Sequence, residues 1–357
     1  MCIAFFVQRY LFTLIKLFSY ICYMGRGDMM NILVTGGAGF IGSHLCKELL
    51  KRKCNVVVVD NFDNLYSPKI KENNIIDIKN FMYCKNIIQD AFKVIKCDIR
   101  DIFKINQIFS EEKTDIVVHL AAMAGVRPSI TDPLTYTDVN VKGTVNLLEM
   151  CKKYKVNKFV LASSSSVYGN NDKVPFSEED SAGCPISPYA ASKRAGELFC
   201  YTYHQLFNID VAALRFFTVY GPGQRPDLAI HKFTKLIFDG EEIPFYGDGL
   251  SERDYTYIDD IIDGIIRTIE WINKENGRFE IFNLGKSHTV SLKTMVELLE
   301  RSIGKKAVIK KLPAQSGDVK RTCADIKKAR EILGYNPSTD IETGINRFIE
   351  WYIKICL

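Results

Sequence analysis

The sequence predicts an α/β protein built on a doubly wound parallel sheet, with a smaller C-terminal α/β lobe. A glycine-rich turn follows the first β-branched run, and short β-branched runs then alternate with longer amphipathic stretches. This alternation is typical of parallel strands joined by helical crossovers. After Tyr220 the alternation fails, and the 357 residues exceed one ordinary core, so a second lobe is expected.

Short β-branched runs mark six expected strands of the main sheet. They lie at residues 31–35, 55–60, 93–98, 115–121, 158–163 and 211–216. Helices are expected after Gly39, Asp101, Pro133 and Ser187, where apolar residues recur at helical spacing. Residues 259–284 are expected to return to this sheet from the second lobe.

Charge and cysteine content argue against nucleic-acid binding and against a structural metal. The 47 Lys+Arg and 42 Asp+Glu give a net charge of only +5, and the basic residues are scattered along the chain. The 11 cysteines form no C-x-x-C pair, so neither a disulfide framework nor a metal site is expected. The expected location is a reducing cytoplasm.

Residues 1–30 form an N-terminal extension with three open interpretations. Its apolar run is broken by Gln8, Arg9 and Lys16, so it lacks the ~18 to 20 apolar residues of a membrane span. It is an artefact of start-site choice or a disordered tail, since Met29 and Met30 directly precede the first strand, or a membrane-associated segment, or a cleaved signal, although no A-x-A-like cleavage site follows.

The turn TGGAGFIG at residues 35–42 predicts a dinucleotide site. Gly36, Gly39 and Gly42 lie between a strand and a helix, where a pyrophosphate approaches bare backbone at a helix N-terminus. Asp60 ends the second strand, where its carboxylate can accept from both ribose hydroxyls and would repel a 2'-phosphate, so the expected cofactor is NAD. The residues expected around NAD are Gly36, Gly39, Phe40, Ile41, Gly42, Asp60, Asn61, Asp98, Ile99, Leu120, Ala121, Ala122, Tyr189 and Lys193.

Tyr189 and Lys193 form a candidate catalytic pair. They are four residues apart at the start of an expected helix, which places the phenol and the ammonium on one face. A phenol with a pKa of about 10 is a poor base, but a neighbouring Lys cation and a positively charged nicotinamide favour phenolate. The serine run at residues 163–166 ends a strand at the ligand-binding edge of the sheet, and one of its hydroxyls could pass a proton to Tyr189.

At these residues the sequence resembles the extended short-chain dehydrogenase/reductase family, within it the nucleotide-sugar epimerases, and most closely the UDP-glucuronate 4-epimerases. The resemblance extends from Asn31 to near Tyr352. The matching blocks are LVTGGAGFIGSHL (33–45), HLAAMAGVRPS (119–129), ASSSSVYG (162–169), SPYAASK (187–193), LRFFTVYGPGQRPD (214–227), RDYTYIDD (253–260) and QSGDVKRTCAD (315–325).

The resemblance implies roles for individual residues. Ser164 would be the catalytic hydroxyl, Tyr189 the base and Lys193 its partner. Arg225 would lie near a hexuronate carboxylate, Arg253 on the diphosphate and Asp318 on the uridine ribose. The full set expected to bind the UDP-sugar is Arg127, Ser165, Ser166, Thr218, Arg225, Arg253 and Asp318. The chain departs from the family at Pro222-Gly223-Gln224, where relatives often carry Trp, and at Lys320, where Pro is common.

The residues after Ser164 separate the reactions of this family. Relatives that eliminate water carry an Asp-Glu pair there, and decarboxylating relatives carry Glu, whereas this chain has Ser165-Ser166. Without a carboxylate, elimination lacks its general acid and base. The expected reaction is therefore NAD-dependent C4 epimerisation of UDP-glucuronate to UDP-galacturonate through a transient 4-keto intermediate. UDP-glucose or UDP-N-acetylglucosamine 4-epimerisation is the alternative, and a non-catalytic NAD-sensing protein is a remote one.

These interpretations define the expected organisation. Residues 31–218 form an NAD-binding Rossmann domain, to which 259–284 return, and residues 219–258 with 285–357 form the UDP-sugar-binding lobe. The expected partners are a UDP-sugar and a second copy of the chain, with no nucleic acid. Membrane association is expected only if residues 1–30 are part of the translated protein.

Overall fold

The computed structural model describes residues 29–313 and 319–356. The chain from Asn31 onward forms one compact unit. The expected extension at residues 1–30 lies almost wholly outside the described residues. In the ranges that are described, no helix combines the length and apolar character needed to cross a membrane.

A seven-stranded sheet in the order β10-β6-β5-β4-β1-β2-β3 organises this unit, and every neighbouring pair in it is parallel. Its strands are β1 (Asn31–Thr35), β2 (Asn55–Asp60), β3 (Phe92–Lys96), β4 (Ile116–His119), β5 (Lys158–Ser164), β6 (Asp210–Phe216) and β10 (Phe279–Leu284). The central strands are buried along nearly their whole length, as expected of a sheet covered on both faces. The predicted doubly wound parallel sheet is confirmed.

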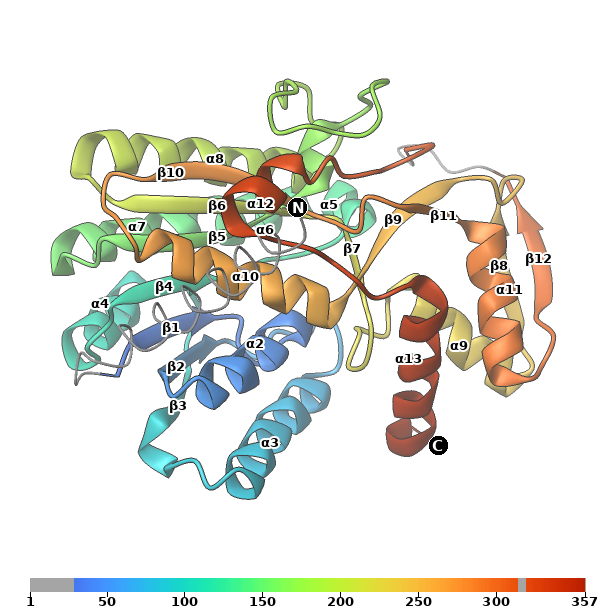
Figure 1. Ribbon diagram of the computed structural model, residues 1–357, viewed down its shortest axis with the longest axis horizontal. Coiled ribbons are helices and arrows are strands. Elements are labelled where there is room, and N and C mark those ends of the chain that lie inside the picture. The colour runs from blue at the N-terminus through green and yellow to red at the C-terminus, as the bar shows by residue number, and fades with distance from the viewer. Residues whose placement is uncertain (1–28, 314–318, 357) are drawn as a thin grey trace, which may run out of the picture. The chain divides into compact units, whose positions relative to one another are not determined.

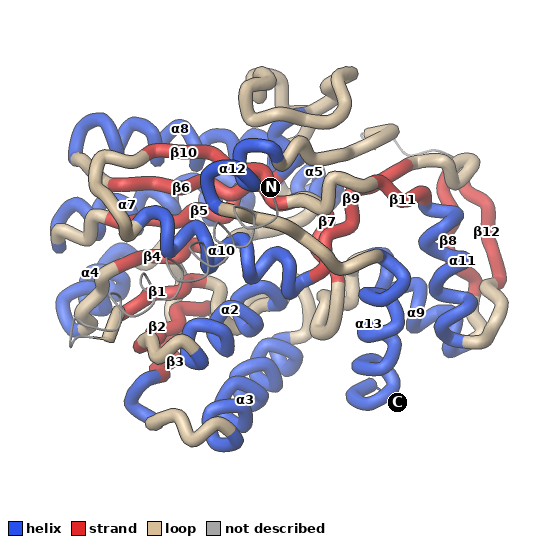
Figure 2. The backbone as a smooth tube through the Cα atoms, in the orientation of Figure 1, coloured by secondary structure: helices blue, strands red, loops and turns tan. Residues whose placement is uncertain are grey.

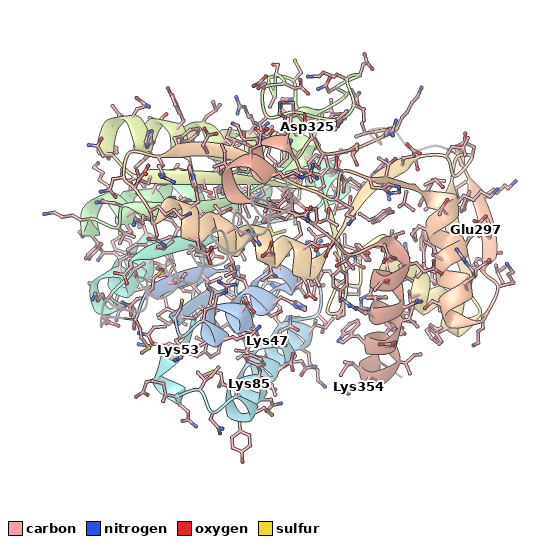
Figure 3. All side chains as sticks on the ribbon, viewed as in Figure 1. Lys47, Lys53, Lys85, Glu297, Asp325 and Lys354 are labelled. Atoms are coloured by element: carbon pink, nitrogen blue, oxygen red, sulfur yellow. The ribbon has the colours of Figure 1, made fainter. Side chains whose placement is uncertain are left out.

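Two helical layers cover this sheet. Their helices are α2 (Phe40–Lys51), α3 (Pro68–Cys84), α4 (Ile102–Glu111), α7 (Gly143–Tyr154), α8 (Pro188–Phe207) and α10 (Ile258–Ile272). Helices α2 and α10 lie side by side although they come from opposite halves of the chain, and α4, α7 and α8 pack in succession (Figure 1). Helix α3 packs on α2, and Lys47 of α2 lies toward α3, where it pairs with Asp77 (Figure 3).

The remaining strands form two small sheets, and the remaining helices pack on these sheets or on the main sheet and its helical layers. The strands are β7 (Thr218–Tyr220), β8 (Glu242–Tyr246), β9 (Glu252–Tyr257), β11 (Thr289–Ser291) and β12 (Val308–Leu312). The helices are α5 (Val126–Thr131), α6 (Pro133–Thr137), α9 (Ala229–Asp239), α11 (Leu292–Ile303), α12 (Lys327–Leu333) and α13 (Ile341–Cys356). Figure 2 shows β8, β12, α9, α11 and α13 grouped on the right, beyond the main sheet. The division into two lobes stays a prediction, because the chain from Asn31 onward is one compact unit.

Two strands end earlier than the sequence suggested, and side-chain hydrogen bonds explain why. Strand β3 stops at Lys96, because the Asp98 carboxylate accepts the backbone N–H of Arg100 and turns the chain. Strand β4 stops at His119, because the Thr35 hydroxyl accepts the backbone N–H of Ala121 and draws the chain away from the ladder. Because the sheet is parallel, the carboxyl ends of both strands lie at the same edge of it.

Candidate active site

A cavity of about 470 Å³ lies at the carboxyl edge of the main sheet, where doubly wound folds bind their ligands. Segments following β1, β2, β3, β4 and β5 line it, together with the start of α8 and the loop after β7. The predicted site residues that line it are Gly36, Gly39, Phe40, Ile41, Gly42, Asp60, Asn61, Asp98, Ile99, Leu120, Ala121, Ala122, Ser164, Ser165, Ser166, Tyr189, Lys193, Thr218 and Arg225.

The glycine turn gives the cavity a floor of bare backbone. Gly36 has a φ of 71°, and a Cβ there would lie 2.7 Å from the backbone nitrogen of Ala121. A Cβ on Gly42 would lie 2.3 Å from the Gly36 oxygen, so only glycine lets α2 approach β1 this closely. Gly39 caps α2 without a side chain, which leaves N–H groups of the first turn available to an anion. These features fit a dinucleotide pyrophosphate.

The Asp60 carboxylate is hydrogen-bonded within the protein but can accept further hydrogen bonds. Its Oδ2 accepts from the Ala38 N–H at 3.1 Å and its Oδ1 accepts from the Phe62 N–H at 2.8 Å. The ammonium of Lys71 lies 3.9 Å from Oδ1. Each carboxylate oxygen has a second lone pair, so Asp60 can still accept hydrogen bonds from ribose hydroxyls.

Asp98 also lines the cavity, but its carboxylate is already hydrogen-bonded within the protein. Its carboxylate accepts from the Asn61 amide and from three N–H groups of Arg100, at 2.9 to 3.0 Å. The Arg100 hydrogen bonds lower the pKa of Asp98 to about 2. Because four hydrogen bonds fill the carboxylate, its side chain shapes the wall, and contacts to an adenine would fall to the backbone beside Ile99.

Ser164, Tyr189 and Lys193 meet at the junction of β5 and α8. The hydroxyl of Ser164 donates to that of Ser166 at 3.1 Å and is hydrogen-bonded to the Tyr189 phenol. Ser187 caps α8 by accepting the Ala190 N–H at 3.1 Å, which fixes the turn that carries Tyr189. The structure thus brings the three candidate catalytic residues together.

Two neighbours shape the electrostatic environment of Tyr189. Burial raises the pKa of Tyr189, and the Ser164 hydrogen bond and the Arg225 charge oppose that rise. The Lys193 ammonium donates to the Ala162 carbonyl at 2.8 Å, and burial lowers the pKa of Lys193 to about 8. Ser164 and Arg225 therefore favour phenolate, and the contribution of Lys193 stays a prediction.

Glu197 supports Lys193 and was missed in the sequence. It is buried one turn after Lys193, and its charge raises the pKa of that lysine. Its carboxylate accepts from Ser163 at 2.6 Å, from Arg215 twice at 2.9 Å, and from Arg194 at 2.7 Å. The available signal was an acidic residue four positions beyond Lys193 on the same helical face.

Asn140 and Tyr66 are further site residues that the sequence reasoning did not identify. Asn140 accepts the N–H of Met123, a lining residue, and donates to Ser192 of α8 at 2.9 Å. It lies in a single π-helical turn before α7, a feature frequent at functional sites. Tyr66 lines the cavity near the Arg225 guanidinium, 5.8 Å from its ring centroid. No motif marked either residue.

Two predicted substrate residues, Arg127 and Arg253, do not line this cavity. Arg127 is exposed, and its guanidinium lies 5.2 Å from the centroid of the Tyr246 ring. Arg253 is on β9, where it donates to the Glu252 carbonyl at 2.9 Å. Neither is among the cavity-lining residues. Asp318 lies outside the described residues.

A dinucleotide cradle joined to a Ser, Tyr and Lys set in one cavity of a doubly wound sheet defines a short-chain dehydrogenase/reductase. A model of the family described as GDP-mannose 4,6 dehydratase matches residues 33–348. The chain belongs to this family of nucleotide-sugar epimerases and dehydratases, which confirms the resemblance inferred from the sequence.

Several known proteins are similar to the chain over almost its whole length. A UDP-glucuronate 4-epimerase of Thermodesulfobacterium geofontis is 42% identical over 89% of this chain and 95% of its own. The crystal structure of a UDP-glucuronic acid 4-epimerase from Bacillus cereus, with UDP-glucuronic acid and NAD, is 38% identical with a TM-score of 0.84, covering 91% of this chain and 100% of that one. A UDP-glucose 4-epimerase of Thermotoga maritima with UDP-glucose is 32% identical with a TM-score of 0.80, covering 92% and 100%.

Proposed function

We propose that this protein is an NAD-dependent UDP-glucuronate 4-epimerase, which interconverts UDP-glucuronate and UDP-galacturonate. One observation carries the proposal. Arg225 lines the same cavity as Ser164, Ser165, Ser166 and Tyr189, while the carboxylates among the described lining residues are Asp60, Asp63 and Asp98, all at the ends of β2 and β3. The sugar end thus offers a cation for a hexuronate and no carboxylate for elimination.

The cofactor residues follow from the cradle. The glycine turn and the first turn of α2 would hold the pyrophosphate, and Asp60 would accept from the adenosine ribose hydroxyls. Bound NAD would supply a reversible oxidation of the sugar at C4, so the cycle has no net redox change. Lys193, at the junction of β5 and α8, would hold the nicotinamide ribose.

Residues of this chain would remove and return the proton of the sugar's C4 hydroxyl. Tyr189 would accept it as phenolate, through or beside the Ser164 hydroxyl to which it is hydrogen-bonded. The Arg225 charge favours that phenolate, and the Ser164 hydroxyl also does so when its proton turns from Ser166 to the phenol oxygen. The same phenol can return the proton after the 4-keto sugar has presented its other face.

The hexuronate carboxylate would be bound by Arg225 with the hydroxyls of Ser165 and Ser166. A 4-keto hexuronate is a β-keto acid that loses carbon dioxide readily, so an epimerase must hold its carboxylate in a geometry that resists this. Thr218, at the start of β7, would contact the sugar. Arg127, Arg253 and Asp318 remain predictions for the UDP end.

The proposal is tested by incubating purified protein with UDP-glucuronate, UDP-glucose and UDP-N-acetylglucosamine in parallel and identifying products by NMR. We expect UDP-galacturonate as the main product of the first reaction and little conversion of the neutral sugars. Preferred conversion of either neutral sugar would replace the proposed substrate. Absence of product and of transient NADH with every sugar would favour the NAD-sensing alternative.

The proposed assembly is a homodimer in the cytoplasm. Leu198, Tyr201 and Leu206 of α8 are each at least half exposed, as is Leu134 of the neighbouring α6. Several exposed apolar side chains on one helical layer are typical of an interface between subunits.

A further inference from the structure

Arg225 is held by a neighbouring carboxylate in the loop between β7 and α9. Its Nε donates to Oδ1 of Asp227 at 3.0 Å and its Nη2 donates to Oδ2 at 2.6 Å, a bidentate pair. The Arg225 side chain is 15% exposed and that of Asp227 is 43% exposed. Such a solvent-facing pair adds little to stability, so its main effect is on the geometry of Arg225.

The pair with Asp227 occupies the Nε and Nη2 edge of the Arg225 guanidinium and leaves the Nη1 and Nη2 edge available. Arginine carries five N–H groups in a rigid plane, and Asp227 takes one on Nε and one on Nη2. The edge formed by Nη1 and Nη2 is a second bidentate site for a carboxylate. Arg225 lines the same cavity as Ser165 and Ser166, whereas Asp227 lies at the surface.

The surroundings define where the Arg225 charge acts. It opposes the burial that raises the pKa of Tyr189, of Tyr66 and of Tyr136, and the guanidinium lies 5.8 Å from the centroid of the Tyr66 ring. Asp227 acts in the opposite direction on Tyr66 and Tyr136. Arg225 is therefore paired with a surface carboxylate and acts electrostatically on the phenol of the catalytic set.

We propose that Asp227 is a positioning residue that holds the Nε and Nη2 edge of Arg225 and so directs the Nη1 and Nη2 edge at the C6 carboxylate of the sugar. The inference deepens the proposed function and rests on it, because only a uronate substrate offers this carboxylate. Asp227 would then determine how well the enzyme retains the carboxylate as well as how tightly it binds the sugar.

If the sugar carboxylate is poorly positioned, the 4-keto sugar can lose carbon dioxide in a side reaction. In the 4-keto sugar the C5–C6 bond can break, its electron pair passing into the C4 enolate while C6 leaves as carbon dioxide. The enolate then takes a proton at C5, which gives a 4-keto pentose. A loosely held carboxylate reaches the alignment for this cleavage more often, so the pentose nucleotide reports on the geometry of Arg225.

The test compares Asp227→Asn with Asp227→Glu, Arg225→Ala and a control, Asp239→Asn. Asp239 pairs with Lys235 on the exposed side of α9, so the control removes the same charge outside the site. For Asp227→Asn we expect kcat/KM on UDP-glucuronate to fall on the order of 10- to 100-fold, with a smaller fall on UDP-glucose and a new pentose product. Arg225→Ala should set the upper limit of both effects. Asp227→Glu should recover part of the loss, and Asp239→Asn should match the parent.

Three results would overturn the inference while leaving the proposed function intact. The first is tighter binding of UDP-glucuronate to Asp227→Asn in calorimetry, which would make Asp227 a competitor for Arg225. The second is a parental ratio of uronate to glucose turnover with no pentose. A parent protein that does not convert UDP-glucuronate would overturn the proposed function and the inference together. A lower thermal midpoint in Asp227→Asn but not in Asp227→Glu, with pentose from neither, would mark a purely structural pair.

Discussion

At the scale of single residues, the phenol of Tyr189 is the group whose loss should matter most. Tyr189→Phe removes the proton acceptor and keeps the ring that packs edge-on against Tyr136 at 6.2 Å. We expect turnover to fall by ~100- to 10,000-fold with UDP-sugar affinity retained. Steady-state rates and calorimetric binding check both halves, with Tyr83→Phe, 86% exposed on α3, as the control. Turnover above a tenth of the parent would assign the base elsewhere.

Lys193 shows a conflict between stability and the proposed activity. Burial lowers its pKa from 10.5 to about 8, so the unfolded chain binds more protons between these pH values and stability rises with pH across that window. Below pH 8 the buried charge opposes folding in full. We therefore expect Lys193→Met to be more stable than the parent near neutral pH, with the difference shrinking between pH 8 and 10.5.

Urea unfolding of both proteins at several pH values, with turnover measured alongside, tests this prediction. The variant should be nearly inactive while being harder to unfold at neutral pH. A variant less stable than the parent at neutral pH would show that the lost hydrogen bond to the Ala162 carbonyl outweighs the relief of burial.

At the scale of elements, two helical glycines should respond to alanine in opposite ways. In α2, a Cβ at Gly42 would lie 2.3 Å from the Gly36 oxygen, so Gly42→Ala must push the helix off the end of β1. In α8, a Cβ at Gly196 would meet only Leu161, at an ordinary 3.5 Å. We expect Gly42→Ala to cost about 1 to 3 kcal/mol and to weaken NAD binding. Gly196→Ala should gain about 0.5 to 1 kcal/mol.

Chemical denaturation and NAD titration of the two alanine variants measure these effects. Equal stability of the two variants would contradict the packing argument at Gly42. Retained NAD affinity in a destabilised Gly42→Ala protein would show that the close approach of α2 serves the fold and not the pyrophosphate.

At the scale of the whole molecule, regular patterns were readable from the sequence and contacts between distant segments were not. The strands, the glycine turn and the parallel, doubly wound character of the sheet followed from β-branched runs and from the crossover rule, which are local signals, whereas the strand order was not predicted. The effect of Arg225 on Tyr189 could not be inferred in this way, because the two residues meet only in the folded chain, as Asn140 and Met123 do. Helix α3 was missed because its apolar face is weak, with few buried residues.

The apolar surface of α8 leads to a prediction about assembly. Leu198 is 52% exposed and Leu206 is 65% exposed, and two turns of helix separate them on one face. A dimer interface would bury them, and leaving them in water costs about 25 cal/mol for each Å² of apolar surface. We therefore expect the parent to be a dimer in light scattering, and Leu198→Glu with Leu206→Glu to be a folded monomer.

Ile76→Glu on α3, at a side chain 54% exposed away from this surface, is the matched control and should remain dimeric. Because the cavity residues come from one chain, the monomer should still bind NAD, and any fall in turnover would then reflect motion of α8, which carries Tyr189 and Lys193. A dimer that survives both glutamates would place the subunit interface on another face, and a monomeric parent would remove the proposed assembly altogether.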